Sequence, residues 1–536
     1  MPQPPNTASA ILTQLALWGV RRIYGVAGDA INPMIDAIGK QSEIRYIAVR
    51  HESAAAFMAS AEGKCASRLG VCIGTSGPGL ANMLNGIADA AADRVPLLVI
   101  TGQVKTDEIG TEAKQYVDQQ RLISPLAVYS ATLMHPDAAL ALLNKAVTEA
   151  LSKRGPAHLT VPKDVLTLPC PWNARLPAGL LEQTLPRNFS QLESAAGLLN
   201  ESLRPIICVG DGARSAGEAI MALADRLQAG IIETLGGKGA VPSSCQWHLG
   251  GIGEGGTRES AELMRESDCV LMIGANWYPE EYVPRDTRVI KIDTDPASIE
   301  TQEDLAFGLV GDAAEAARLL AEKIHSGKRA AWAQRVQTVR QAIRQRLDAE
   351  RKPASRVITP PSLMAALEQH VSRDGIIAVD TGDHTIWFNR MFRAEKQTIL
   401  FSGKWRSMGF ALPAALAAKL QYPDKQVTAL AGDGSFLTTA MELATLAKYQ
   451  VPIKIIIANN GVYAIEKNKM AEAGMQPYGV ELANPDFAAL AAAFGIRSFR
   501  ADTPDTLTSA LREMYADDQA ALLDVRITAP APMASI

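Results

Sequence analysis

Short, continuous runs of apolar residues alternate with helical patterns along almost the whole chain. In the first third, the runs RRIYGVAG, IRYIAVR and LGVCIGTSG are followed by DAINPMIDAIGK, HESAAAFMASAEGKCAS and PGLANMLNGIADAAAD. Runs of this kind, rich in β-branched side chains, are typical of parallel strands buried on both faces. The sequence therefore predicts an α/β fold of doubly wound parallel sheets, with ligands bound at the C-terminal ends of strands.

Two interruptions divide this pattern into three parts. The Pro-rich segment LPCPWNARLPAGLLEQTLPRN, residues 168–188, predicts a linker. The charged stretch that begins KRAAWAQRVQ predicts a solvated helix and connector. We expect three doubly wound domains, over residues 1–175, 186–345 and 356–536, because 536 residues suffice for three or four domains.

The composition favours a small-molecule partner in the cytoplasm. Charged residues make up 21% of the chain and the net charge is −4, so no basic surface for nucleic acid is indicated. The six cysteines form no C-x-x-C pair, which is typical of reduced thiols. No basic, apolar leader and no run of about 18 apolar residues occurs, so we expect neither secretion nor a membrane span.

The most informative segment is ALAGDGSFLTTAMELATLAKYQVPIKIIIANNGVYAIE, which predicts strand, helix and strand. A Gly-Asp-Gly turn after a buried strand lets the backbone approach a ligand, and the following helix N-terminus favours phosphate. Asp433 can hold a cation there, with the Asn460 amide oxygen and the Val462 carbonyl as further ligands. Mg²⁺ prefers such oxygen ligands, together with phosphate oxygens. The turn alone is weak evidence, and the later Asn-Asn pair makes it specific.

These motifs resemble those of the thiamine diphosphate-dependent enzymes, over nearly the whole chain. The sequence is most similar to the branch that contains pyruvate oxidase, quinone-dependent pyruvate dehydrogenase and acetolactate synthase. The resemblance implies pyrimidine-binding, central and diphosphate-binding domains, and Mg²⁺ at Asp433, Asn460 and Val462. On the diphosphate side it implies cofactor contacts from Gly382, Asp383, His384, Met408, Gly432, Gly434, Ser435 and Tyr463. Met408 would wedge the cofactor into a bent shape, unless it is only a flexible core filler.

The first domain carries the other half of the resemblance. In VRHESAAAF, Glu52 stands at a helix start, where an acid ordinarily complements the helix dipole. The matching glutamate of the family hydrogen-bonds the aminopyrimidine and stabilises the imino tautomer that removes the thiazolium C2 proton. Gly77, Pro78, Gly79 and Asn82 match the pyrimidine-side loop and helix. Because the family usually contacts the two halves of the cofactor from different chains, a homodimer or homotetramer is implied.

The central domain resembles the flavin-binding domain of the pyruvate oxidases. The resemblance implies that FAD lies along Gly212, Ala213, Arg214, Thr234, Lys238, Gly274, Asn276, Asp293 and Asp312. The alternative is a folded remnant without flavin, as in the non-oxidative decarboxylases. Acetolactate synthases also carry FAD without net oxidation, so flavin alone would not establish oxidase activity.

Three positions depart from the pyruvate oxidase pattern. Glu466 stands where oxidases generally have an apolar residue, and its spacing is similar to that of a catalytic glutamate in pyruvate decarboxylases. Asp29 matches an acidic loop residue of the decarboxylases that the quinone-dependent dehydrogenases share. Lys114, before Gln115, replaces an aromatic residue; it could attract an anion or be only a solvated cation. A buried Glu466 would have a raised pKa and could relay a proton, which favours non-oxidative chemistry.

The resemblance leads to a decarboxylating enzyme for a small 2-oxo acid, with pyruvate as the default. We expect Glu52 to activate the cofactor, and Glu466 with Gln115 to handle the enamine that follows CO₂ loss. In the leading hypothesis the enamine passes electrons to FAD; in the alternative it is protonated or attacks a second carbonyl. We also expect no membrane anchor, because the chain stops at DVRITAPAPMASI, soon after the last predicted strand.

Overall fold

The computed structural model contains three parallel β-sheets flanked by helices. It describes residues 5–66, 68–171, 174–175, 188–275, 280–300, 305–325, 327, 329–352 and 356–530. Each sheet has six strands, and neighbouring strands are parallel throughout. The expected α/β fold of three doubly wound domains is therefore confirmed. Every described helix is too short or too polar to cross a lipid bilayer.

The N-terminal domain has the strand order β2-β1-β3-β4-β6-β5. Its strands are β1 Arg22–Gly25, β2 Arg45–Ala48, β3 Gly70–Gly74, β4 Leu97–Gln103, β5 Tyr129–Thr132 and β6 Pro156–Pro162. Its helices are α1 Thr7–Leu17, α2 Asn32–Gly39, α3 Glu52–Ala66, α4 Pro78–Ala92, α5 Gln119–Ile123, α6 Ala139–Lys153 and α7 Lys163–Thr167.

The C-terminal domain repeats this topology, with the order β14-β13-β15-β16-β18-β17. Its strands are β13 Ile376–Val379, β14 Thr398–Phe401, β15 Val427–Gly432, β16 Lys454–Asn459, β17 Arg497–Ala501 and β18 Ala521–Arg526. Its helices are α14 Pro360–Glu368, α15 Asp383–Met391, α16 Ala411–Gln421, α17 Asp433–Leu437, α18 Leu443–Tyr449, α19 Ala464–Glu472, α20 Phe487–Ala493 and α21 Pro504–Met514.

The central domain has a different order, β12-β11-β10-β7-β8-β9. Its strands are β7 Pro205–Val209, β8 Gly230–Glu233, β9 His248–Gly251, β10 Cys269–Ile273, β11 Arg288–Asp293 and β12 Leu305–Val310. Its helices are α8 Leu192–Glu201, α9 Gly217–Leu227, α10 Arg258–Arg265, α11 Pro296–Glu300, α12 Ala313–Lys323 and α13 Ala330–Glu350. Counted within the domain, this is the strand order of the dinucleotide-binding folds.

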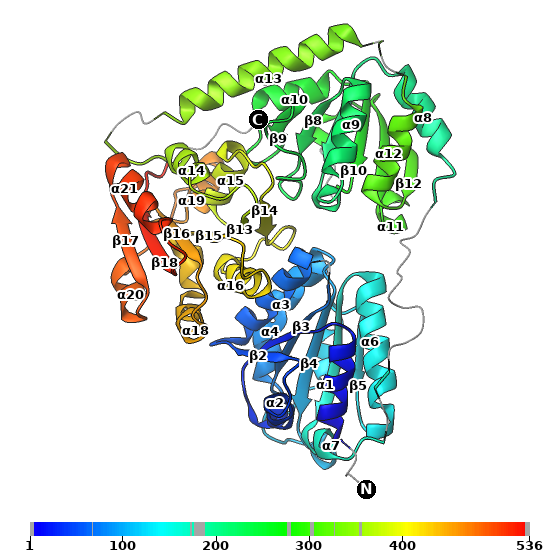
Figure 1. Ribbon diagram of the computed structural model, residues 1–536, viewed down its shortest axis with the longest axis vertical. Coiled ribbons are helices and arrows are strands. Elements are labelled where there is room, and N and C mark those ends of the chain that lie inside the picture. The colour runs from blue at the N-terminus through cyan, green and yellow to red at the C-terminus, as the bar shows by residue number, and fades with distance from the viewer. Residues whose placement is uncertain are drawn as a thin grey trace.

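The structure describes the expected connector but only part of the expected linker. Most of the segment 168–188 lies outside the described residues. The charged connector is helix α13, which runs to Glu350, beyond the boundary expected at residue 345. It is not fully solvated, because Trp332, Val336 and Ile343 are buried in the core of the central domain. Figure 1 shows α13 lying across that domain.

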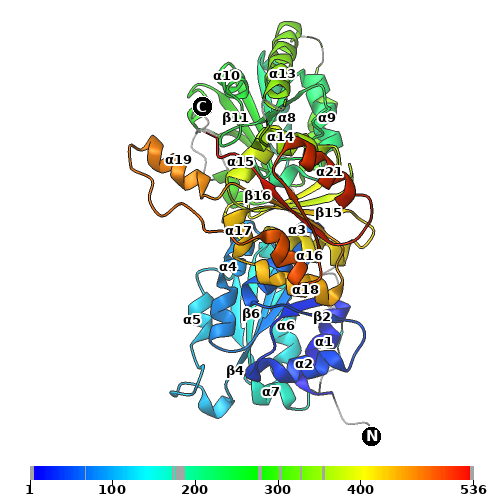
Figure 2. The same ribbon diagram turned by 90° about the vertical axis from the view of Figure 1, so that its left-hand side faces the viewer.

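The N- and C-terminal domains share one apolar core. Helices α3 and α16 meet there, and the rings of Phe57 and Phe410 pack edge to face at 6.0 Å. The central domain has a separate core and contacts the C-terminal domain on another side. In Figure 2, α19 projects away from the body of the C-terminal domain.

Candidate active site

Two loops meet at the C-terminal edge of the C-terminal sheet, between β13 and β15. The chain leaves these neighbouring strands in opposite directions, to β14 and to β16, so the loops form a crevice of the kind in which α/β proteins bind ligands. The crevice is tight: a Cβ on Gly432 would lie 2.9 Å from Nδ1 of His384. The structure thus brings the predicted Gly382-Asp383-His384 and Gly432-Asp433-Gly434 loops together.

Asp433 begins α17 and is 3% exposed. Its Oδ2 accepts hydrogen bonds from the backbone N–H of Gly461 and from Nδ2 of Asn484, both at 2.7 Å. Burial raises the pKa of Asp433, and these hydrogen bonds only partly offset that effect. A cation beside the carboxylate would stabilise its charged form, so the position suits a metal ligand.

The two asparagines after β16 have different roles. The Oδ1 of Asn460 accepts a hydrogen bond from the backbone N–H of Val462 at 3.1 Å, which orders the loop that carries both predicted ligands. Asn459 is buried; its Nδ2 donates to Asp524 and its Oδ1 accepts from Asn484. Asn459 and Asn484 therefore hold Asp433 in place. The Asn-Asn pair in the sequence drew attention to Asn459, but no sequence motif indicated Asn484.

The turn after Asp433 leaves no room for side chains. A Cβ on Gly434 would overlap Cε1 of Tyr463, the residue that precedes α19. The Oγ of Ser435 accepts a hydrogen bond from the N–H of Gly432 at 3.1 Å and closes the turn. A ligand at this turn would meet the backbone closely, and backbone N–H groups at a helix start are suited to a phosphate group.

His384 is buried and neutral. It is 4% exposed, and burial lowers its pKa to about 4. Its Nε2 finds no hydrogen-bond partner within the described part of the chain. A buried polar atom without a partner is costly, so this nitrogen fits a site that a ligand completes. Asp383 accepts a hydrogen bond from Nε1 of Trp387 at 2.9 Å and lines the cavity described below.

The structure also brings together the residues predicted for the pyrimidine side of the cofactor. Glu52 is the first residue of α3, and its Oε2 accepts a hydrogen bond from Nδ2 of Asn82 at 2.9 Å. Gly77 precedes α4 with a φ of 62°, and a Cβ there would lie 2.7 Å from the carbonyl oxygen of Gln115. Gln115 is thus beside the pyrimidine-side loop, with a left-handed φ of 66° and an exposed side chain.

Asp29, Lys114 and Met408 are all exposed. Asp29 forms an ion pair with Lys163 at 2.7 Å across the same edge of the N-terminal sheet. Met408 is 39% exposed, so it does not fill the core of this chain. Nearby, Nε1 of Trp405 donates to Asn85 on α4 at 2.8 Å.

The central domain presents its own crevice between β7 and β10, where its strand order reverses. Gly212 follows β7, and its N–H donates to the carbonyl of Gly274, which follows β10, at 3.0 Å. Gly274 has a φ of 58°, a conformation that favours glycine. Asp293 ends β11 and is 6% exposed; its Oδ2 has no partner among the described residues. These features fit a nucleotide, whose ribose hydroxyls can donate to such an oxygen.

A cavity of about 2450 Å³ is lined by residues of all three domains. Among the residues predicted for FAD, the cavity is lined by Gly212, Arg214, Thr234, Gly274, Asp293 and Asp312. Lys238 lies elsewhere: it is buried, pairs with Glu233 at 3.0 Å and donates to the carbonyl of Asn389. Ala213 is buried in the core of the central domain, and Asn276 lies outside the described residues.

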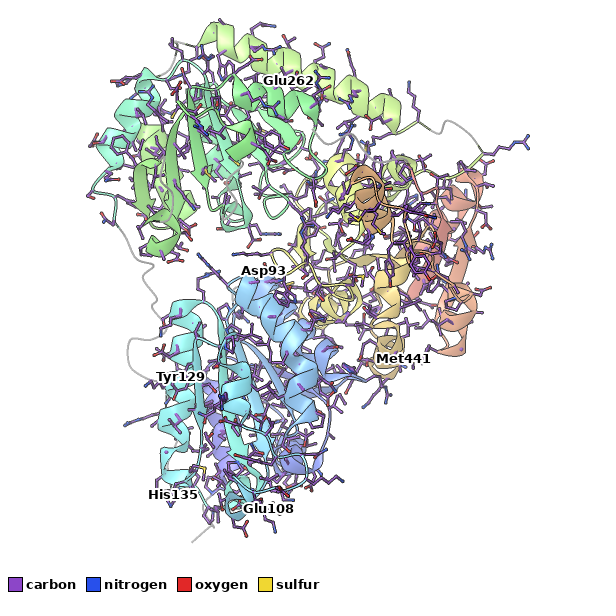
Figure 3. All side chains as sticks on the ribbon, turned by 180° about the vertical axis from the view of Figure 1, so that it is seen from behind. Asp93, Glu108, Tyr129, His135, Glu262 and Met441 are labelled. Carbon is purple, nitrogen blue, oxygen red and sulfur yellow. The ribbon has the colours of Figure 1, made fainter. Side chains whose placement is uncertain are left out.

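Glu466 lies on the first turn of α19, where it is exposed and lines the same cavity. The expected burial of Glu466 is thus not found in this single chain. Asp93, at the end of α4 in the N-terminal domain, also lines the cavity (labelled in Figure 3). The cavity therefore extends from the predicted nucleotide residues to Asp383 and Glu466.

Comparison with known proteins matches all three domains to one family. The models for the N-terminal TPP binding, central and C-terminal TPP binding domains of thiamine pyrophosphate enzymes match residues 5–122, 192–320 and 380–525. A Bacillus subtilis protein, YdaP, described as thiamine pyrophosphate-containing, is 32% identical over 98% of this chain and 93% of its own. An acetolactate synthase large subunit of Parasynechococcus marenigrum is 31% identical over 98% and 88%. The pyruvate oxidase of Lactiplantibacillus plantarum is 28% identical over 98% and 89%.

Proposed function

The chain belongs to the thiamine pyrophosphate enzyme family, and from this premise we propose that it decarboxylates a small 2-oxo acid and delivers the released electrons to FAD. Thiamine diphosphate, which is thiamine pyrophosphate, and Mg²⁺ are the cofactors in this proposal, and pyruvate is the first substrate to test. The observation that carries it is the continuous cavity between the predicted nucleotide residues and the crevice at Asp383. Pockets for small ligands commonly occupy about 300–1,000 Å³, so this one has room for a large cofactor and a substrate.

Thiamine diphosphate would supply the electron sink that makes loss of CO₂ from a 2-oxo acid possible. Asp433, Asn460 and the Val462 carbonyl would hold Mg²⁺, and the Gly432–Ser435 turn would face the diphosphate. His384 would donate or accept one hydrogen bond through Nε2, in its neutral form. Glu52 would exchange a proton with the aminopyrimidine ring, while Asn82 fixes its carboxylate at 2.9 Å.

The remaining residues would handle the substrate. Gln115 has its carbonyl against Gly77, which places its exposed side chain at the pyrimidine-side loop. Glu466 would supply or take up a proton at the cavity wall. Met408 would support the cofactor in its bent shape, and its 39% exposure leaves its side chain accessible for that contact.

FAD is proposed for the central crevice. Its support is the dinucleotide-type strand order and the hydrogen bond between the Gly212 and Gly274 loops. A further support is Oδ2 of Asp293, which has no partner in the part of the chain that the structure describes. Asp312, which caps α12, lines the same cavity. These residues would hold FAD, which would supply a two-electron acceptor for the proposed oxidation.

A second candidate is acetolactate synthase-like carboligation, in which a second carbonyl compound replaces FAD as the acceptor. It is favoured by the acetolactate synthase of Parasynechococcus marenigrum, which resembles this chain along nearly its whole length. Glu466, exposed to the cavity, could serve as the proton relay of such a reaction or of simple aldehyde release.

One experiment separates these outcomes. The purified protein is loaded with thiamine diphosphate, Mg²⁺ and FAD, and pyruvate is added without oxygen while the flavin spectrum is recorded. Bleaching of the flavin together with CO₂ release supports the oxidative proposal. Acetolactate or acetaldehyde from an enzyme whose flavin stays oxidised supports the second candidate and overturns the first. Glu466→Gln adds a check, because it should reduce aldehyde release more than flavin reduction.

The proposal includes a homodimer or homotetramer, with each site built by two chains. Near the Asp433 turn, Met408, Leu437 and Met441 expose 39%, 39% and 60% of their surface. Exposed apolar side chains beside a polar crevice are typical of a surface that another chain covers. Light scattering of the purified protein checks this: a monomer that still turns over pyruvate would contradict it.

A further inference from the structure

Strand β2 forms an edge of the N-terminal sheet and leads directly into Glu52. Among the described strands it pairs with β1 alone, and the N–H of Val49 donates to the carbonyl of Gly25 at 3.0 Å. Because N–H groups alternate sides along a strand, those of Ala48 and Arg50 point away from the sheet. Edge groups of this kind must find partners when another part of the molecule buries them.

The C-terminal domain supplies those partners. The hydroxyl of Tyr449, at the end of α18, accepts a hydrogen bond from the N–H of Ala48 at 2.7 Å. The Oε1 of Glu442 accepts from the N–H of Arg50 at 3.0 Å and from that of His51 at 3.1 Å. Glu442 ends the short 3-10 helix Ala440–Glu442, which follows α17. Its neighbour Met441 lies at the boundary of the two domains in Figure 3.

Glu442 is held in this orientation. It is 1% exposed, and the hydroxyl of Thr445 donates to its other carboxylate oxygen. Burial raises the pKa of Glu442, and the hydrogen bonds from Thr445, Arg50 and His51 only partly offset that effect. The carboxylate also lies just before the first residue of α3, a helix of 15 residues whose N-terminal dipole favours negative charge.

We propose that Glu442 is a positioning residue for Glu52. It fixes the backbone of the two residues that precede Glu52, and so sets where the Glu52 carboxylate projects from α3. The 3-10 helix comes directly after the Asp433 turn, so the metal-binding segment of a chain and the Glu52 turn of the same chain are tied together. The inference rests on the proposed function, because the role of Glu52 does.

Glu442→Met tests the contact, since methionine keeps the length of the side chain but offers no acceptor to Arg50 and His51. Glu442→Gln is the matched control, because its amide oxygen can accept both hydrogen bonds that Oε1 accepts now. Thr445→Val is a milder second variant that loosens Glu442 without removing it. The exposed Glu513 of α21 provides a distant control as Glu513→Gln.

Three quantities are measured on the protein without substrate: amide hydrogen exchange at residues 50–52, the dissociation constant of thiamine diphosphate with Mg²⁺, and exchange of the C2 proton of the bound cofactor. Glu442→Met should speed amide exchange and slow C2 proton exchange about 10-fold or more, since proton transfer depends on the position of the acid. The dissociation constant should change by less than about 3-fold, a free energy below 1 kcal/mol. Thr445→Val should shift the same two rates less, and both Gln variants should behave as the natural protein.

Faster amide exchange with unchanged C2 exchange would overturn the proposal and leave Glu442 a structural residue only. If Glu442→Met does not fold, Thr445→Val provides the test. Faster amide exchange at residues 50–52 with an unchanged rate of C2 proton exchange in that variant would also overturn the proposal. A natural protein that binds thiamine diphosphate but exchanges no C2 proton would instead contradict the proposed function. The amide-exchange comparison would then still report whether Glu442 holds the turn.

Discussion

Glu52 is the residue on which the proposed chemistry depends most directly. Its Oε2 accepts a hydrogen bond from the neutral side chain of Asn82. Glu52→Gln keeps the size and the hydrogen bond to Asn82 but cannot exchange a proton. We expect turnover to fall by about 10²–10⁴-fold, the usual contribution of acid–base catalysis. Steady-state assays with saturating cofactor measure this.

The control for that variant is Glu43→Gln, an exposed glutamate of the same domain. Both variants should unfold at the temperature of the natural protein, because neither carboxylate supports the core. Glu52→Gln with undiminished turnover would refute the role of Glu52. Equal losses in both variants would point to a general effect on the domain.

The effect of Asp433 on the stability of the protein should differ between the metal-free and the metal-bound state. Its folded-state pKa is raised by burial, so the folded protein binds its proton more tightly than the unfolded chain. Stability of the metal-free protein therefore falls as pH rises from the usual aspartate range through the raised pKa. Asp433→Asn removes the free-energy cost of burying an ionised carboxylate, so it should not lower the melting temperature of the metal-free protein at pH 7.

The same variant should lose the stabilisation that the cofactor provides. At a ligand concentration 100 times the dissociation constant, binding stabilises by about 2.7 kcal/mol. Thermal melts with and without thiamine diphosphate and Mg²⁺ measure both effects. For the natural protein the cofactor-induced shift should shrink as pH falls, because Mg²⁺ needs the ionised carboxylate. A full shift in Asp433→Asn would exclude Asp433 as a metal ligand.

At the scale of elements, the apolar runs predicted the strands well because parallel strands buried on both faces leave little choice of residue. The runs RRIYGVAG and LGVCIGTSG contain β1 and β3, for example. Helix α13 was misjudged as solvated, since Trp332, Val336 and Ile343 are diluted among arginines and glutamines. Glu52 and Asp433 stood out because they lie at strand ends within motifs. Asn484 and Glu442 did not, because their partners are 51 and 391–392 residues away in the chain.

The crossing of the β7 and β10 loops can be tested with glycine substitutions. A Cβ on Gly210 would overlap Cα of Ala275 and the carbonyl oxygen of Gly274. Gly210→Ala should cost about 1–3 kcal/mol of stability through overpacking and should reduce the flavin retained on purification. Gly197→Ala is the matched control: Gly197 lies within α8, and a Cβ there meets nothing within 4 Å. That variant should be neutral or more stable, by up to about 1 kcal/mol.

Urea unfolding and the flavin absorbance of the purified variants measure the two effects. Full flavin content in a destabilised Gly210→Ala protein would mean that nucleotide binding does not depend on the close contact between the β7 and β10 loops. Equal destabilisation by both substitutions would contradict the packing argument, because only one of the two glycines is crowded.

At the scale of the whole molecule, the N-terminal domain contacts each of the other two domains through a cation, and the two cations differ in burial. Within the N-terminal domain, Lys64 of α3, with a side chain 11% exposed, pairs with the buried Asp89 at 2.8 Å and with Asp93 at 2.7 Å. It also donates a hydrogen bond to the carbonyl of Phe401 on β14 of the C-terminal domain. Burial alone would lower the pKa of Lys64, but the two carboxylates raise it overall. Arg94 pairs with Asp295 of the central domain at 2.8 Å, with both side chains more than a third exposed.

Substitution of each cation by methionine should therefore have unequal effects. Lys64→Met leaves Asp89 buried without its cation and should destabilise the protein by about 3–5 kcal/mol. Arg94→Met breaks a solvent-exposed pair, which is typically worth only about 0–1 kcal/mol. Urea unfolding at low and high salt measures the difference, and salt should reduce only the Arg94 effect, because screening acts on exposed charges. Similar losses from both substitutions would mean that the N-terminal domain depends on its two junctions equally, against the burial of the Lys64 cluster.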